Sequence, residues 1–91
     1  MKAEAVVVIG NRYGFHVRPT TQFVALAQRY GSSIAVRTPG GNRADGKSVL
    51  ELLSLGVSSG DSLTIEAEGD DCREAVAGLA DLVNGRFGGM E

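Results

Sequence analysis

The sequence predicts an α+β domain in which helices cover one face of a single antiparallel sheet. Segments with the apolar spacing of strands and of helices follow one another in the order β-α-β-β-α-β-α. Glycine and proline divide these segments into short pieces. The chain has only 91 residues, which suffices for one domain with one modest core. These elements are too few for doubly wound parallel units, so the layered α+β class is the one that fits.

The first strand and the first helix are predicted from two different apolar patterns. Residues 3–9 (AEAVVVI) are rich in β-branched side chains and are expected to form a buried strand. A loop over residues 10–14 follows. The next apolar side chains have helical spacing, at Val17, Phe23, Val24, Ala27 and Tyr30. Gly31 follows this stripe and is the predicted C′ residue, since glycine can take a positive φ.

The middle of the chain continues with two strands joined by a turn. Residues 33–38 place Ile34 and Val36 between more polar neighbours, which predicts a half-exposed strand. The turn covers residues 39–42, where proline and two glycines interrupt the pattern. A very short strand at residues 43–45 completes this pair.

A second helix and a fourth strand follow. The helix is predicted over residues 47–55, with Ser48 near its start as a capping residue and Gly56 at its end. Leu52 and one neighbour are expected to face the sheet. Apolar and polar side chains then alternate over residues 63–68, which predicts a strand with one buried face.

The last helix is predicted to begin at residues 70–71. Glu74 lies three residues after Asp71, a spacing that resembles a capping box with aspartate at the cap. Its buried stripe comprises Val76, Leu79, Ala80, Leu82 and Val83. Residues 84–85 end it. We treat residues 1–91 as one domain and expect residues 85–91 to be a loose tail.

The composition excludes several classes of protein. The longest apolar run, residues 5–9, is much shorter than a membrane span, and the N-terminus lacks the pattern of a secretory signal. The single cysteine, Cys72, cannot form an internal disulfide, which favours a reducing cytoplasm. Cys72 falls in the first turn of the last helix and is interpreted as structural. We therefore expect a cytoplasmic monomer that does not associate with membranes.

The net charge of −2 conceals an uneven distribution. Residues 1–47 carry seven basic and two acidic side chains (+5), whereas residues 48–91 carry two basic and nine acidic ones (−7). A weakly acidic domain without basic runs interleaved with aromatic residues is a poor nucleic-acid binder. The basic half is suited instead to one anion or to an acidic protein face.

The only histidine, His16, lies in the most informative stretch, Gly14-Phe15-His16-Val17-Arg18-Pro19-Thr20. A neutral imidazole is a nucleophile at physiological pH. Two helix starts are compatible with Pro19. If Arg18 is the N-cap, Pro19 is the first helical residue, its preferred place. If His16 is the N-cap, Pro19 is the third, where its missing N–H breaks no intrahelical bond.

Either start places free backbone N–H groups and the positive end of a helix beside His16, an arrangement that binds anions. Arg18 can add a guanidinium to the same anion, and Arg12 can approach across the loop. A phosphate held there would lie within reach of the imidazole. A phosphorylated imidazole is labile, as a carrier that passes its phosphoryl group on requires.

This stretch resembles the active-site signature of the HPr family, the histidine-containing phosphocarriers of the bacterial phosphotransferase system. The usual form of the signature is Gly-Leu-His-Ala-Arg-Pro-Ala. A second block, residues 45–56 (DGKSVLELLSLG), is similar to the family's Lys-Ser helix and the turn after it. The C-terminal strand, Gly69-Asp70-Asp71 and the final helix match as well. The likeness covers residues 3–84, and two separate motifs at the family's spacing make it specific.

The resemblance implies an open-faced β-sandwich with a four-stranded antiparallel sheet and three helices. It also implies that His16 accepts a phosphoryl group on Nδ1 from phosphoenolpyruvate-charged enzyme I. His16 would then pass this group to a IIA domain or protein, in sugar uptake or in a regulatory branch such as nitrogen control. Arg18 would hold the phosphoryl group. Such a protein is a carrier and not a self-sufficient enzyme, and it needs neither cofactor nor metal in its own site.

Three residues depart from the family signature. Phe15 stands where leucine is common, and Val17 and Thr20 replace alanine. We expect these side chains, with Phe15 and Thr20 among the partner-binding residues, to influence which partners dock and how fast. The nucleophile, the arginine and the proline are retained, so acceptance of the phosphoryl group is still expected.

Ser48 matches the position that a dedicated serine kinase phosphorylates in many Gram-positive relatives, although serine is also an ordinary N-cap. Phosphate there would add about −1.5 to −2 charges at a helix start, which repels an acidic partner without harming the fold. By the same resemblance, Val49, Leu50 and Leu53 are candidates for an exposed partner-docking patch beside His16. Lys47 is expected to bind partners too and to neighbour the phosphoryl site. The alternative is that the three apolar residues are core.

Two other functions are consistent with parts of the sequence. A small regulatory or ligand-binding module would use His16 and Arg18 as a passive anion site without covalent chemistry. A metal site is weakly supported, because one histidine and one distant cysteine offer no cluster of ligands. The carrier is the leading hypothesis.

Overall fold

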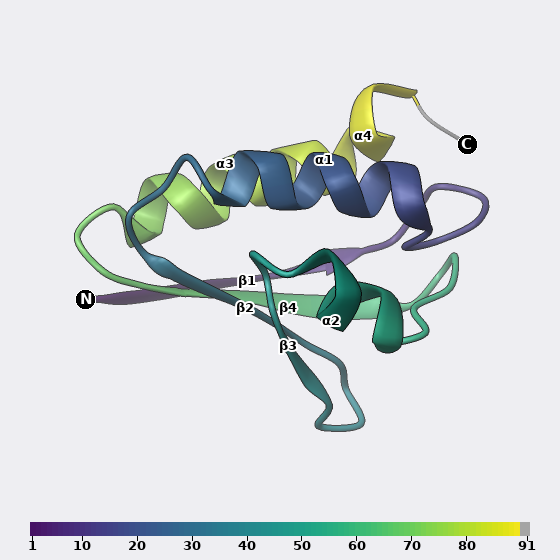
Figure 1. Cartoon of the computed structure of the whole chain (residues 1–91), viewed down its shortest axis with the longest axis horizontal. Coiled ribbons are helices and arrows are strands. Elements are labelled where there is room, and N and C mark those ends of the chain that lie inside the picture. The colour runs from purple at the N-terminus through teal and green to yellow at the C-terminus, as the bar shows by residue number, and fades with distance from the viewer. Residues whose placement is uncertain (90–91) are drawn as a thin grey trace.

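The computed structural model describes residues 1–89 and confirms the predicted α+β class with its open-faced arrangement (Figure 1). Its elements are β1 (Lys2–Val8), α1 (Val17–Ala27), β2 (Ser33–Arg37), β3 (Arg43–Asp45), α2 (Val49–Ser54), β4 (Ser62–Glu68), α3 (Cys72–Asn84) and the short turn α4 (Arg86–Gly89). The strand order is β1-β4-β2-β3, and all neighbouring pairs are antiparallel. Helices α1 and α3 lie side by side over one face of the sheet.

The sheet has one face toward the helices and one face open. On the inner face, Val7, Val36 and Ile65 are each at most 3% exposed. On the open face of β1, Val6 and Val8 are 70% and 56% exposed. The prediction of a wholly buried first strand is therefore wrong. β1 is an edge strand with only alternate side chains in the core, and its β-branched open-face residues suit the strand backbone without being covered.

The helices close the core from above. Phe23 of α1, Leu52 of α2 and Leu79 of α3 are fully buried, as their predicted apolar stripes require. Helix α2 is followed by its C-cap, Leu55, and then by Gly56, whose φ of +66° confirms its predicted role as the residue that stops the helix. The expected C′ role of Gly31 is wrong, because α1 ends four residues earlier, at Ala27, and Gly31 has no positive φ.

Asp71 joins the start of α3 to the loop between α1 and β2. Its carboxylate accepts hydrogen bonds from the N–H groups of Gly31 (2.9 Å) and Ser32 (3.0 Å), and from Ser32 Oγ (2.5 Å). These bonds, chiefly that from Ser32 Oγ, lower the pKa of Asp71 below its ordinary value of 3.8. Asp71 is the N-cap residue, but its side chain makes no cap hydrogen bond, so the predicted capping box is wrong.

The loose tail predicted from residue 85 is also wrong for the part that the structure describes. Phe87 is only 2% exposed. The φ angles of Arg86 and Phe87 are +52° and +55°, and those of Gly88 and Gly89 are also positive. A left-handed conformation costs a non-glycine residue about 1–2 kcal/mol, and burial of a phenylalanine contributes about 1.5–3 kcal/mol. Burial of Phe87 thus offsets much of this strain. Residues 90–91 lie outside the described residues.

Candidate functional site

His16 is the N-cap of α1, which settles the helix start. Its backbone is extended (φ −98°, ψ −173°), and its carbonyl accepts the first intrahelical bond, from Thr20 N–H at 3.1 Å. Pro19 is consequently the third helical residue. The N–H groups of Val17 and Arg18 occupy the first two positions and have no acceptor inside the helix. The first turn contains no acidic side chain, so its positive end is available to an external anion.

The loop before His16 is fixed against the chain that follows α2. Gly14 has a φ of +66°, and a Cβ there would overlap the carbonyl oxygen of Val57 and lie 2.8 Å from Ser58 Cα. Phe15 N–H donates to the same Val57 carbonyl at 3.2 Å. Only glycine allows the two segments to approach this closely, so Gly14 determines where His16 begins the helix.

Asn11 was not identified from the sequence, yet it supports His16. Its side chain is 1% exposed, and Nδ2 donates to the carbonyl of Gly14 at 2.6 Å. The same carbonyl accepts from His16 N–H at 3.1 Å. Asparagine side chains commonly form hydrogen bonds with nearby backbone in turns. The presence of Asn11 in the 10–14 loop could therefore have predicted that it stabilises this loop.

Two residues expected at the partner surface lie inside the protein. Phe15 is 5% exposed, and its ring centroid lies 5.6 Å from that of Phe23 and 6.0 Å from that of Phe87. Thr20 is fully buried on the inner side of α1. Their assignment to partner binding is wrong, because the first turn of α1 directs Thr20 toward the core and Phe15 fills an aromatic cluster beneath the loop.

Tyr13, also missed in the sequence, lies against the imidazole. The ring centroids of Tyr13 and His16 are 5.9 Å apart and the planes are nearly perpendicular, at 86°. The guanidinium carbon of Arg12 lies 5.3 Å from the Tyr13 ring centroid, a cation–π distance. Arg12 is thus placed on Tyr13. Arg18 and Val17 are exposed on the first turn of α1.

Lys47 lies away from the cluster of basic residues around His16. Its Nζ donates at 2.7 Å to the carbonyl of Tyr30, which follows the C-terminal end of α1, whereas His16 precedes the N-terminal end. The idea that Lys47 neighbours the phosphoryl site is wrong for this reason. A lysine at this position interacts favourably with the negative end of a helix.

Ser48 is the N-cap of α2, as predicted from the sequence. Its backbone is extended and its Oγ accepts from Glu51 N–H at 3.2 Å. Of the proposed docking residues, Leu50 is 79% exposed. Val49 and Leu53 are half-buried, and Val49 packs against the core.

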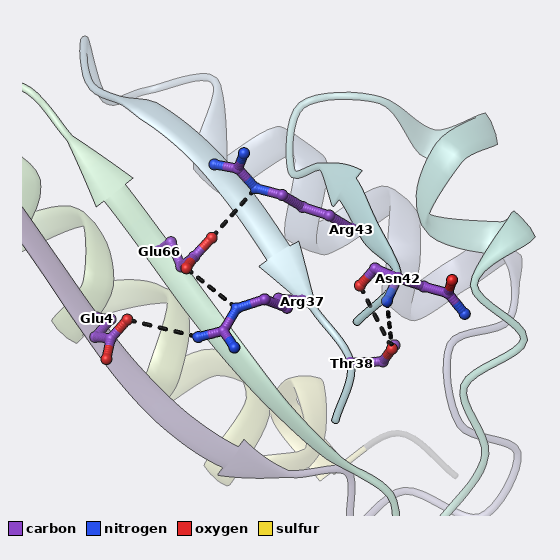
Figure 2. A network of polar contacts seen from close by, with 6 residues as sticks. All are labelled: Glu4, Arg37, Thr38, Asn42, Arg43 and Glu66. Carbon is purple, nitrogen blue, oxygen red and sulfur yellow. Dashed lines mark hydrogen bonds and ion pairs between the residues drawn. The ribbon is translucent and has the colours of Figure 1, made fainter. Parts of the chain in front are cut away.

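A hollow region lies on the open face of the sheet, away from His16. Its volume is 810 Å³, and its lining includes Glu4, Arg43 and Glu66. The Glu66 carboxylate forms ion pairs with Arg37 Nε at 3.2 Å and with Arg43 Nε at 3.3 Å (Figure 2). Arg37 Nη2 also forms an ion pair with Glu4 Oε2 at 3.8 Å. The charges of both signs are paired with one another and partly exposed, so this hollow presents no concentrated charge for an anion.

Residues 1–89 lack two further features. No group of three or more histidine, cysteine, aspartate or glutamate side chains is arranged to hold a metal ion within these residues. None of their helices is long and apolar enough to span a membrane.

Fold and site together define a small α+β domain that presents one imidazole at the start of a helix whose first N–H groups have no intrahelical acceptor. Residues 3–85 match the family model described as "PTS HPr component phosphorylation site". The phosphocarrier protein HPr of Borreliella burgdorferi is 41% identical over 83 residues, covering 91% of this chain and 93% of that protein. The phosphocarrier protein NPr of Klebsiella oxytoca is 34% identical over 87 residues, covering 96% and 97%.

Solved structures agree with this match. The crystal structure of HPr from Thermoanaerobacter tengcongensis superposes with a TM-score of 0.91 at 37% identity, covering 98% of this chain and 99% of that one. The chain belongs to the HPr family of phosphocarrier proteins of the phosphotransferase system.

Proposed function

We propose that His16 is the phosphoryl acceptor of this carrier, charged by phospho-enzyme I and discharged to a IIA domain or protein. The observation that carries the proposal is the position of His16 as N-cap of α1, beside two backbone N–H groups without intrahelical acceptors. The family match supports the carrier role in general. The specific donor, acceptor and residue are our inference.

In the charging step, Nδ1 of the neutral imidazole attacks the phosphorus atom held by enzyme I. The N–P bond forms as the bond from phosphorus to the donor group breaks, and the donor group keeps that electron pair. The ring proton stays on Nε2. In the discharging step the nucleophile of the IIA protein attacks the same phosphorus, and the N–P electron pair returns to His16.

The phosphoryl oxygens require donors as their charge approaches the helix. We assign this role to the N–H groups of Val17 and Arg18 and to the Arg18 guanidinium, which is exposed on the same turn. Arg12 contributes positive potential from its place on the Tyr13 ring. These groups stabilise a dianionic adduct without a covalent bond, so they do not prevent its transfer.

The partner surface is proposed to surround this helix start. Val17, at 61% exposed, and Leu50, at 79% exposed, are the apolar side chains available to a docking protein. Leu53 and Val49 contribute their exposed portions. Arg12 and Arg18 favour acidic partners through long-range attraction. Lys47 remains a proposed partner contact at the other end of α1.

Whether the carrier serves sugar uptake or a regulatory process is determined by the partner proteins that accept its phosphoryl group, and not by the carrier itself. Sugar uptake and a regulatory branch such as nitrogen control both use this chemistry. We place the protein in the cytoplasm, where it would meet enzyme I, and a single unpaired cysteine is consistent with a reducing compartment.

Intact-mass measurement with phosphoenolpyruvate and enzyme I tests the proposal. The expected result is a gain of one phosphoryl group that mild acid removes and that His16→Ala abolishes. A protein that stays uncharged with several different enzymes I would instead be a passive anion-binding module. Addition of a IIA protein should then return the charged carrier to its starting mass.

Phosphorylation of Ser48 is a second, regulatory proposal. Its Oγ lies at the start of α2, two residues before the exposed Leu50. A phosphate would be tolerated by the helix start but would repel acidic partners. Ser48→Asp keeps an N-cap oxygen and should weaken enzyme I binding, whereas Ser48→Asn keeps the cap without the charge and should not. Equal affinities of both variants would contradict the electrostatic switch.

A further inference from the structure

The C-terminal strap, which we define as residues 85–89, has a conformation that ordinary side chains avoid. Four successive residues, 86–89, have positive φ angles, and two of them are not glycine. The turn is closed by hydrogen bonds from the N–H groups of Gly88 and Gly89 to the carbonyl of Gly85, both 3.2 Å. Such a turn persists only where surrounding contacts hold it in place.

One of those contacts is the aromatic cluster under the phosphoacceptor loop. The Phe87 ring centroid lies 6.0 Å from that of Phe15, with an angle of 57° between the planes, and Phe87 is 2% exposed. Phe15 in turn contacts Phe23 of α1 in an edge-on arrangement. Phe15 directly precedes His16 in the chain, so Phe87 supports the residue that positions the proposed nucleophile.

The second contact is made by Arg86 at the beginning of the same loop. A Cβ added to Gly10 would lie 3.3 Å from Arg86 Nε and 3.7 Å from its Cγ. The Arg86 side chain therefore runs along the Gly10 backbone. The strap touches the chain at Gly10 and at Phe15, the two sides of the 11–14 segment that leads to His16. Figure 1 shows α4 above α1, toward the end where this loop enters the helix.

We infer that the C-terminal strap is a positioning element for the phosphoacceptor loop and that Phe87 is a positioning residue acting through Phe15. The inference rests on the proposed function of His16. Removal of the Phe87 ring leaves a cavity beneath Phe15, and the strained turn loses the contact that holds it. The 10–16 loop then gains freedom, and the imidazole spends less time in the orientation that accepts phosphate.

Amide hydrogen exchange of the whole chain tests the positioning role without depending on the phosphoryl chemistry. In Phe87→Ala, the amides of Phe15 and His16, which donate to Val57 and Gly14 carbonyls, should exchange about tenfold faster than in wild type. The matched control is Val76→Ala. Val76 is equally a buried core residue, at 6% exposed, but it lies in the first half of α3, near Asp71.

The comparison is made at temperatures where the two variants have the same folded fraction. Faster exchange in Phe87→Ala than in Val76→Ala supports the inference, and equal exchange of these two amides overturns it. Phe87→Leu, which keeps an apolar side chain of similar reach, should restore most of the protection. If Phe87→Ala does not fold, Phe87→Leu decides the question. The inference then requires that the Phe15 and His16 amides of Phe87→Leu exchange faster than those of the wild type.

Phosphoryl acceptance from saturating enzyme I gives the functional half of the test. The rate constant should fall about tenfold in Phe87→Ala and remain near wild type in Val76→Ala, because misplacement of a reacting group slows its reaction. If the wild type is charged and Phe87→Ala is charged with the same rate constant, the strap inference is overturned but the proposed function is not. A wild-type protein that is never charged at His16 overturns the proposed function. In that case the hydrogen-exchange experiment still tests the positioning role of the strap, because it does not depend on phosphoryl transfer.

Discussion

Asn11 donates from Nδ2 to the carbonyl oxygen of Gly14 at 2.6 Å, and this carbonyl also accepts from the N–H of His16. A single carbonyl thereby joins a buried side chain to the backbone of the proposed nucleophile. Gly14 has a positive φ and is packed against Val57 and Ser58. The position of the imidazole is therefore set by the loop before it as much as by the helix after it.

Asn11→Asp should lower the free energy of unfolding by about 2–3 kcal/mol, since it replaces a buried donor with an acceptor that faces the Gly14 carbonyl. Urea denaturation measures the change. Asn84→Asp makes the same chemical exchange at an exposed position and should change stability by no more than about 0.5 kcal/mol. Equal effects of the two substitutions would show that the Asn11 hydrogen bond does not support the loop.

Gly14→Ala and Gly56→Ala separate backbone strain from close packing. Both glycines have a φ of +66°, but a Cβ at Gly56 meets nothing within 4 Å, whereas one at Gly14 overlaps Val57. We expect Gly56→Ala to cost about 1–2 kcal/mol, the cost of the conformation alone. Gly14→Ala should cost at least about 1 kcal/mol more because it also overpacks the contact. Thermal and urea unfolding of the pair give the comparison, and identical losses would argue against close packing at Gly14.

Protonation of Asp71 is expected to lower the free energy of unfolding in acid. Hydrogen bonds from Ser32 Oγ, and next from Gly31 N–H, lower its folded-state pKa below the ordinary value of 3.8. The carboxylate therefore contributes stability above pH 3.8, and this stability is lost as the pH falls through 3.8 toward the lower folded-state pKa. Asp71→Asn should flatten this part of the curve of unfolding free energy against pH. Asp70→Asn, which changes the exposed neighbour, should leave the curve unchanged; a wild-type curve in Asp71→Asn would contradict the assignment.

Arg18→Glu should slow charging by phospho-enzyme I by at least about tenfold while leaving Tm nearly unchanged, because its side chain is exposed and we propose that it holds the phosphoryl group. The rate is measured by rapid quench at saturating enzyme I. Arg73→Glu reverses an exposed charge on α3 and controls for the change in net charge. Equal charging rates in the two variants would remove Arg18 from the phosphoryl site.

The fold was predictable because its apolar patterns are local. The spacing of Phe23, Val24 and Ala27 and the alternation of Leu63, Ile65 and Ala67 determine which face each element buries. Val6 and Val8 were misplaced because a run of apolar residues does not reveal that one face of the sheet stays uncovered. That depends on where the helices pack, which long-range contacts decide.

The candidate site was predictable in its position at a helix start and less so in its surroundings. His16, Arg18 and Ser48 stand out because their types and spacing relate directly to helix starts. Phe15 and Phe87 were misjudged because each is buried by the other, across 72 positions of chain. Lys47 was misplaced for a similar reason, since nothing in the sequence indicates that its ammonium group meets the Tyr30 carbonyl.

The central claim is that His16 Nδ1 carries the phosphoryl group. Nitrogen-15 and phosphorus-31 NMR of the protein, during charging with phosphoenolpyruvate and enzyme I, tests it most directly. We predict one phosphorus signal per chain, coupled to Nδ1 of His16, and its disappearance when a IIA protein is added. A charged protein whose His16 ring signals do not change, or a His16→Ala variant that is charged equally well, would contradict the account.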